Sequence, residues 1–160
     1  MKLLLAFVSI VMDLLLLNIY RVTNLNLNYF YPMFTLSSLV YICNLYSNPN
    51  RKNYYYFVLI IAILYDTLVT NNLLITVSLF EIIAFINIKL KKNFSNNLFN
   101  NIIRTMLSIF IYDLLFHLLL VFVRYQDFNI LKVFYKVSHS LLINLIYVSI
   151  MFFVLKNKKA

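Results

Sequence analysis

Four of the five acidic residues in this 160-residue chain lie within long apolar segments. They are Asp13, Asp66, Glu81 and Asp113. An ionised carboxylate near the centre of a bilayer costs about 2.5–3.5 kcal/mol on insertion scales. Such groups therefore usually face the interior of a helix bundle, and a functional role is the default hypothesis. The alternative is a hydrogen bond that joins two helices, which suits Asp13 and Glu81 well.

A second pattern combines Asp113 with His117, four residues later and so on the same face of a helix. A metal site or a proton relay could use this pair. The only other histidine, His139, belongs to another segment, and the single cysteine, Cys43, lies in an apolar run. We therefore expect a simple Asp113–His117 hydrogen bond, with no metal ion and no cofactor.

The chain contains no glycine. A phosphate-cradling loop, a dinucleotide-binding fingerprint and a GxxxG helix pair all require glycine, and the sequence also lacks HExxH and any recognisable Ser/His/Asp arrangement. The motifs give no support for an enzyme.

The amino-acid composition indicates that the surface of this protein faces lipid and not water. Hydrophobic residues make up 63% of the chain and charged residues only 12%, whereas the surface of a soluble domain is roughly 25–35% charged. The net charge of +9 does not indicate nucleic-acid binding, because the basic residues lie mainly in short gaps between apolar runs, where they orient helices. The partner of this surface is the lipid bilayer.

We expect an all-α polytopic membrane protein, a single domain over residues 1–160 that forms a bundle of about six transmembrane helices with short loops. A crossing needs about 20 residues. The third and fourth spans form one long apolar stretch, which we divide at Asn71-Asn72. The predicted spans are 3–20, 29–46, 54–70, 73–89, 98–123 and 137–155.

The loops between these spans alternate in charge. Because cytoplasmic loops carry an excess of lysine and arginine, both termini are predicted to be cytoplasmic. Arg104, near the start of the fifth span, is expected to snorkel to the membrane surface. Residues 124–136 mix apolar and charged residues and predict a short amphipathic helix on the outer surface. One side receives Lys2, Arg51, Lys52, Lys89, Lys91, Lys92, Lys156, Lys158 and Lys159, and the other receives Arg21, Arg124, Lys132 and Lys136.

One stretch resembles a known family. Tyr31-Pro32 opens an apolar segment, a short basic loop follows, and then comes Ile61-Ala62-Ile63-Leu64-Tyr65-Asp66-Thr67-Leu68, with a further helix that ends at Lys89-Leu90-Lys91-Lys92. This arrangement, over about residues 29–92, resembles the rod shape-determining protein MreD family. Pro32 and Asp66 are the matched residues. The chain departs from the family at Met33, where an acidic residue is common, and in having no glycine around the aspartate.

The resemblance implies a place in the bacterial cytoplasmic membrane, beside the bitopic protein MreC. Members of the family link MreB filaments to the RodA glycosyltransferase and its penicillin-binding transpeptidase. The implied role is to scaffold and regulate lateral peptidoglycan synthesis without catalysis. Because Asp66 lies just before a predicted hairpin turn, we expect it to tie helix ends together rather than to bind a substrate.

Two transport functions remain open. The substrate-binding subunits of energy-coupling-factor vitamin importers are also small six-helix bundles with short loops. Such a subunit needs a solute pocket near the outer surface, to which Asp66, Asp113 and His117 could contribute polar groups. A proton-coupled secondary transporter could use the intramembrane carboxylates, but many such folds contain inverted repeats and broken helices, and no repeat is visible here.

Overall fold

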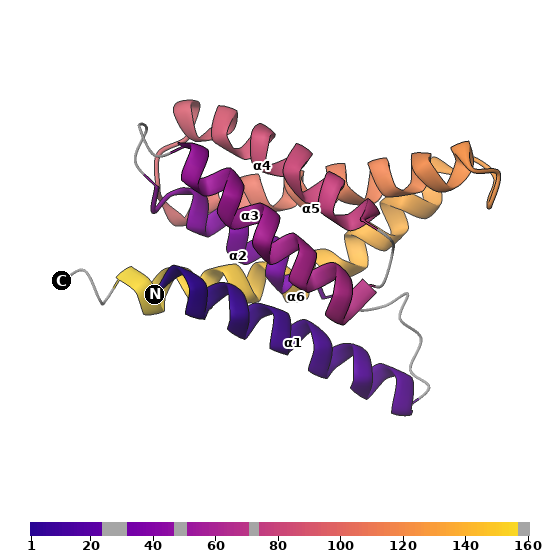
Figure 1. Cartoon of the computed structure of the whole chain (residues 1–160), viewed down its shortest axis with the longest axis horizontal. Coiled ribbons are helices and arrows are strands. Elements are labelled where there is room, and N and C mark those ends of the chain that lie inside the picture. The colour runs from indigo at the N-terminus through magenta and orange to yellow at the C-terminus, as the bar shows by residue number, and fades with distance from the viewer. Residues whose placement is uncertain (24–31, 47–50, 71–73, 157–160) are drawn as a thin grey trace.

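A computed structural model of the chain describes residues 1–23, 32–46, 51–70 and 74–156 (Figure 1). These residues form six α-helices and one π-helical turn, so the all-helical architecture predicted from the sequence is confirmed. The elements are α1 (Lys2–Thr23), α2 (Phe34–Cys43), α3 (Arg51–Tyr65), the π-helical turn η2 (Asp66–Thr70), α4 (Ile75–Asn93), α5 (Leu98–Phe122) and α6 (Ile130–Lys156).

Among the described residues, four segments are long and apolar enough to cross a membrane: α1, α3 with η2, α5 and α6. By length and composition the chain is consistent with a multi-pass membrane protein. α4 is 19 residues long, but its last turns are basic. In Figure 1, α1, α3 and α5 run in one direction and α4 and α6 return, so the start of α1 and the end of α6 lie at the same end of the bundle. We call this end the N-terminal end.

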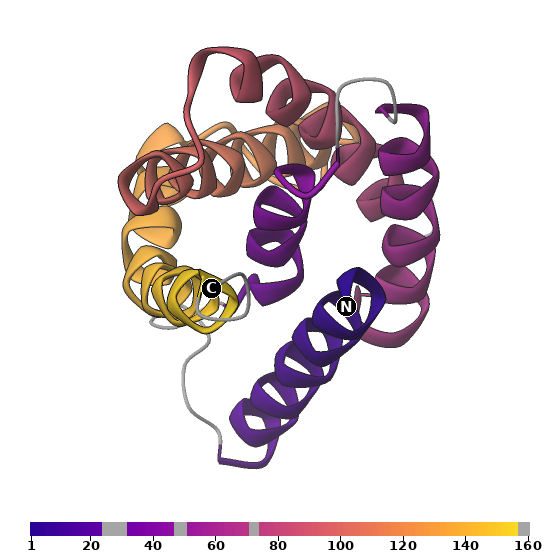
Figure 2. The same cartoon turned by 90° about the vertical axis from the view of Figure 1, so that its left-hand side faces the viewer.

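The helix α2 lies at the centre of the bundle, and the view along the bundle shows it enclosed by the other helices (Figure 2). It packs against all five of them, and each of its ten residues is buried. Ten residues span about 15 Å, half of a hydrocarbon core of about 30 Å. The predicted span 29–46 thus contains a helix only over Phe34–Cys43 among the described residues. Its predicted start at Tyr29 lies outside them.

The long apolar stretch divides into two helices, as predicted, but the expected break at Asn71-Asn72 lies outside the described residues. Leu74, which precedes α4, has a φ of 70°, and Arg124, which follows α5, has a φ of 59°. This left-handed conformation normally favours glycine because a Cβ atom crowds the following carbonyl. A chain without glycine places larger residues at these two turns.

The segment 124–136 does not form a separate amphipathic helix, so that prediction was wrong. Residues Ile130–Lys136 are the first turns of α6, which continues without interruption to Lys156. The physical reason is that the segment packs on the bundle, where Val133 is buried and Lys136 faces α5. Lys136 reaches a buried carboxylate there, as described below, instead of facing the headgroups.

Candidate functional site

Asp13 of α1 caps the start of α2. Its Oδ1 accepts a hydrogen bond from the Phe34 N–H at 2.9 Å. Its Oδ2 accepts from the Thr35 N–H at 2.9 Å and from the Thr35 hydroxyl at 2.7 Å. The first amide groups of a helix have no partner within the helix, and Asp13 is fully buried. A carboxylate from another helix therefore supplies the acceptors that this helix lacks.

The preceding two residues complete the same turn. Pro32 has no N–H to satisfy, and the Met33 N–H donates to Asn144 Oδ1 of α6 at 2.9 Å. Asn144 is itself fully buried. Side chains from α1 and α6 thus accept hydrogen bonds from the amide groups at the start of α2 that have no partner within the helix. This arrangement joins three helices.

The opposite end of α2 is held by two cations. The Lys91 ammonium of α4 donates to the carbonyl oxygens of Cys43, at 3.1 Å, and of Tyr46. The Arg104 guanidinium of α5 donates to Asn44 Oδ1, just after the helix, and to the Asn87 carbonyl at 3.2 Å. A helix carries partial positive charge at its start and partial negative charge at its end. The charges around α2 therefore match its dipole at both ends.

Arg104 does not snorkel to the surface, so that prediction was wrong. Its side chain is fully buried because Asn44, just after α2, and Asn87 of α4 offer acceptors inside the bundle. Asn44 Nδ2 donates to Asn101 Oδ1 at 2.7 Å, and Asn87 Nδ2 donates to Ser108 Oγ at 2.8 Å. These contacts join α2, α4 and α5 into one buried polar network.

Asp66 bridges the hairpin between α3 and α4. Its Oδ1 accepts from the Thr70 hydroxyl at 2.7 Å, and its Oδ2 accepts from the Leu74 N–H at 2.8 Å. Thr70 also lies 3.0 Å from the Thr76 hydroxyl in the first turn of α4. Asp66 is buried, and both of its oxygens take part in the turn. This geometry is the helix tie that its position before a hairpin led us to expect.

Glu81 of α4 is only half-buried, unlike the three aspartates. Its Oε1 atom is buried and has no hydrogen-bond partner among the described residues. The interhelical hydrogen bond expected of this carboxylate is therefore not made at that atom.

Asp113 and His117 line the same pocket but do not form the hydrogen bond that we predicted. The Asp113 Oδ1 lies 2.7 Å from the Lys136 ammonium of α6. The His117 Nε2 accepts from the Asn129 N–H at 3.1 Å, and its Nδ1 lies 2.7 Å from the Gln126 side-chain amide. Each side chain thus bonds across the α5–α6 connection instead of along α5.

The pocket, which we call the outer pocket, lies between α5 and α6 at the end of the bundle opposite the N-terminal end. It has a volume of about 90 Å³, and its lining combines apolar side chains with Asp113, His117, Lys132 and Lys136. Within the described ranges, no group of three or more His, Cys, Asp and Glu side chains is placed to hold a metal ion.

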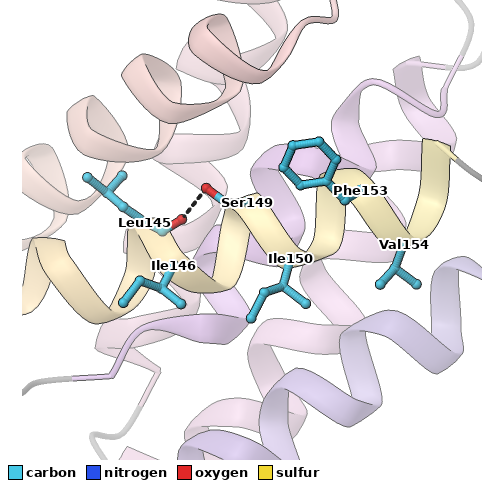
Figure 3. Close-up of a pocket in the computed structure, with 6 residues that line it drawn as sticks. All are labelled: Leu145, Ile146, Ser149, Ile150, Phe153 and Val154. Carbon is cyan, nitrogen blue, oxygen red and sulfur yellow. Dashed lines mark hydrogen bonds between the residues drawn. The ribbon is translucent and has the colours of Figure 1, made fainter.

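The outer face of α6 is apolar and carries two shallow grooves. One, of about 480 Å³, is lined by α6 alone (Figure 3). The second, of about 300 Å³, lies between α5 and α6. Ser149 lies in the first groove and Ser138 in the second. Each hydroxyl bonds to a carbonyl of its own helix, at 2.8 Å in both cases, so neither leaves an unsatisfied polar group toward lipid.

Several residues of the buried network were missed by sequence reasoning. Asn44, Asn87, Asn144 and Lys91 each bond a distant helix, and Lys136 was assigned to a surface loop. A usable signal was present, since Asn87 and Asn144 interrupt apolar runs in the same way as the carboxylates. An amide in lipid needs partners as a carboxylate does.

Known proteins offer no match to this arrangement. No protein-family model, curated protein or solved structure matches the chain. The interpretation below therefore rests on the geometry described above and on the resemblance noted in the sequence.

Proposed function

We propose that this protein is a non-catalytic membrane component of the bacterial cell-elongation machinery, similar to MreD, and that it scaffolds lateral peptidoglycan synthesis. It resides in the cytoplasmic membrane with all six helices contributing to crossings. Its partners are an MreC-like bitopic protein, MreB filaments, and a RodA-type glycosyltransferase with its penicillin-binding transpeptidase.

The main support for this proposal is the position of Pro32 and Asp66, the two residues that match the MreD family. Pro32 precedes the central helix α2 at the turn that Asp13 and Asn144 complete. Asp66 gives both carboxylate oxygens to the α3–α4 hairpin. Both residues therefore serve to build the bundle, as expected of a scaffold whose shape is its function.

The direction of the helices supports the proposed topology. α1, α3 and α5 run away from the N-terminal end, and α4 and α6 return to it (Figure 1). α2 ends at Cys43, where Lys91 from the last turn of α4 reaches its carbonyl, so α2 supplies the inner half of the second crossing. The basic residues at the start of α1 and the end of α4 support a cytoplasmic position for this end, because cytoplasmic segments carry an excess of lysine and arginine.

The surface available to partners is mainly apolar. α1 and α6 present large side chains that are about half exposed, such as Phe7 (55%) and Ile150 (56%). Partner helices in a bilayer associate through van der Waals packing and small residues. The two α6 grooves with Ser138 and Ser149 suit such contacts, and the basic N-terminal end faces the cytoplasmic partners.

The vitamin-importer alternative receives less support. Asp66 uses both oxygens within its own turn and does not line the outer pocket. That pocket, at about 90 Å³, is smaller than the roughly 300–1,000 Å³ of typical small-molecule sites.

The test is affinity purification of the tagged chain from its native membrane in mild detergent, with partners identified by mass spectrometry. We expect an MreC-like protein, a RodA-type glycosyltransferase or its transpeptidase to be recovered. A matched Asp127→Asn variant, changed at an exposed loop residue, should retain the same partners. Recovery of a membrane coupling protein with paired ATPases in their place would overturn the proposal and favour the importer.

A further inference from the structure

The outer pocket contains a buried carboxylate that is only partly satisfied. The Asp113 side chain is 1% exposed, and its Oδ1 faces the Lys136 ammonium at 2.7 Å. Its Oδ2 is also buried and has no hydrogen-bond partner among the described residues. A buried carboxylate oxygen without a donor is costly. The floor of the pocket therefore offers an acceptor for an incoming N–H or ammonium group.

The mouth of the pocket has the opposite charge. Lys132 is exposed and makes a long 3.5 Å contact with Gln126 Oε1. Of the other polar lining residues, Lys136 pairs with Asp113, and His117 has both ring nitrogens engaged by Gln126 and Asn129. Lys132 is thus the group best placed to pair with an anion that enters from outside.

A simple ion can pair with only one of these two ends. A lone cation at Asp113 would face the ammonium groups of Lys132 and Lys136, which line the same pocket. A lone anion on Lys132 would leave the buried Asp113 Oδ2 without a donor. A molecule with an ammonium at one end and a carboxylate at the other matches both.

We propose that the outer pocket binds a small free zwitterion of the amino-acid class, with its ammonium on Asp113 Oδ2 and its carboxylate on Lys132. The volume of about 90 Å³ equals that of about three water molecules at roughly 30 Å³ each. This space suits glycine or alanine and excludes amino acids with large side chains. The site is independent of the proposed scaffolding function.

The test is equilibrium binding of radiolabelled glycine to the purified full chain in lipid nanodiscs, with ethylamine, acetate and phenylalanine as unlabelled competitors. We expect saturable binding, with each competitor at least about tenfold weaker than unlabelled glycine. Lys132→Gln should weaken binding about tenfold or more. Because Lys132 is exposed, this variant should fold normally, and Lys92→Gln at the N-terminal end is its matched control.

Asp113→Asn removes the negative charge that pairs with the ammonium group and should abolish binding. The Lys132 variant still tests the proposal if Asp113→Asn fails to fold. A pocket that holds water alone would give no saturable glycine binding up to about 10 mM, which would overturn the proposal. Binding unchanged by Lys132→Gln, or ethylamine competing as well as glycine, would also overturn it. None of these outcomes bears on recovery of the cell-elongation partners.

Discussion

Two buried aspartates in this bundle have opposite surroundings. Asp13, at the start of α2, accepts three hydrogen bonds and has donors on both carboxylate oxygens. Asp113, in the outer pocket, has an ion pair on one oxygen and no partner for the other among the described residues. Both lie in apolar segments of the sequence. The number of donors around each carboxylate distinguishes a structural group from one that can take a ligand.

The neighbours of the two aspartates explain this difference. Asp13 faces the start of a helix, where backbone N–H groups have no partner within the helix. Asp113 lies within α5, whose amides are already bonded, and it pairs only with the Lys136 side chain, which is 34% exposed. A helix start supplies several fixed donors, whereas the side of a helix supplies none.

The largest effect should come from removing the Asp13 cap. Asp13→Ala leaves two buried N–H groups without an acceptor, and at 1–3 kcal/mol for each unsatisfied group we expect unfolding free energy to fall by about 3 kcal/mol. Asp113→Ala should cost only about 1 kcal/mol, because Lys136 can turn to water. Denaturant unfolding in bicelles measures both. Equal losses would contradict the distinction between these sites.

Arg104→Met should have the next largest effect. The change leaves Asn44 Oδ1 and the Asn87 carbonyl without their guanidinium donor, which we expect to lower the unfolding free energy by about 2 kcal/mol. The same measurement on Lys92→Met, at an exposed residue of α4, should show a change within about 0.5 kcal/mol. A similar small change for Arg104→Met would show that the buried network adds little stability.

Asp66→Asn should have a smaller effect of about 1 kcal/mol, because the amide can still accept from Leu74 but loses a charge-assisted bond. We expect cellular protein level and support of cell shape to fall together. Quantitative immunoblotting with cell-shape measurement checks this, with Asp127→Asn as control. Normal protein level with lost function would show that Asp66 contacts a partner or ligand as well as the turn.

The smallest effect should be a gain. Leu74 is 65% exposed and has a left-handed φ of 70°. Asparagine tolerates this conformation better than leucine, so Leu74→Asn should raise the unfolding free energy by about 0.5–1 kcal/mol. Leu74→Ala keeps the Cβ atom and should give no such gain. An equal gain for both variants would mean that removal of an exposed leucine, and not backbone strain, is responsible.

Much of the helical architecture followed from the sequence because apolar segments of about 20 residues are a strong signal. Leu98–Phe122 was predicted within one residue. The length of α2 could not be predicted in this way. An apolar run indicates which residues are buried, but it does not show at which residue the helix begins. The start at Phe34 depends on Asp13 and Asn144, both distant in sequence.

The sequence indicated which carboxylates lie inside the bundle, with the exception of the half-buried Glu81, but not how their side chains pair. Asp13, Asp66, Asp113 and His117 are all buried. The spacing of Asp113 and His117 put them on one face of α5, but Lys136 and the loop after α5 offered closer partners. The spacing of residues along one helix does not show which side chains of a neighbouring segment pack against them. Those neighbours determine the partners of Asp113 and His117.

Charged groups on other helices hold α2 at both of its ends. Cys43, the single cysteine of the chain, lies buried at the end of α2 and can report on it. The most direct measurement is the rate at which a membrane-permeant maleimide labels Cys43 in nanodiscs. A helix of ten residues is too short to be stable alone, so Asp13→Ala and Arg104→Met should each speed labelling at least about tenfold, while Asp113→Ala leaves it unchanged. Unchanged labelling in the first two variants, or equally fast labelling in all three, would contradict the account.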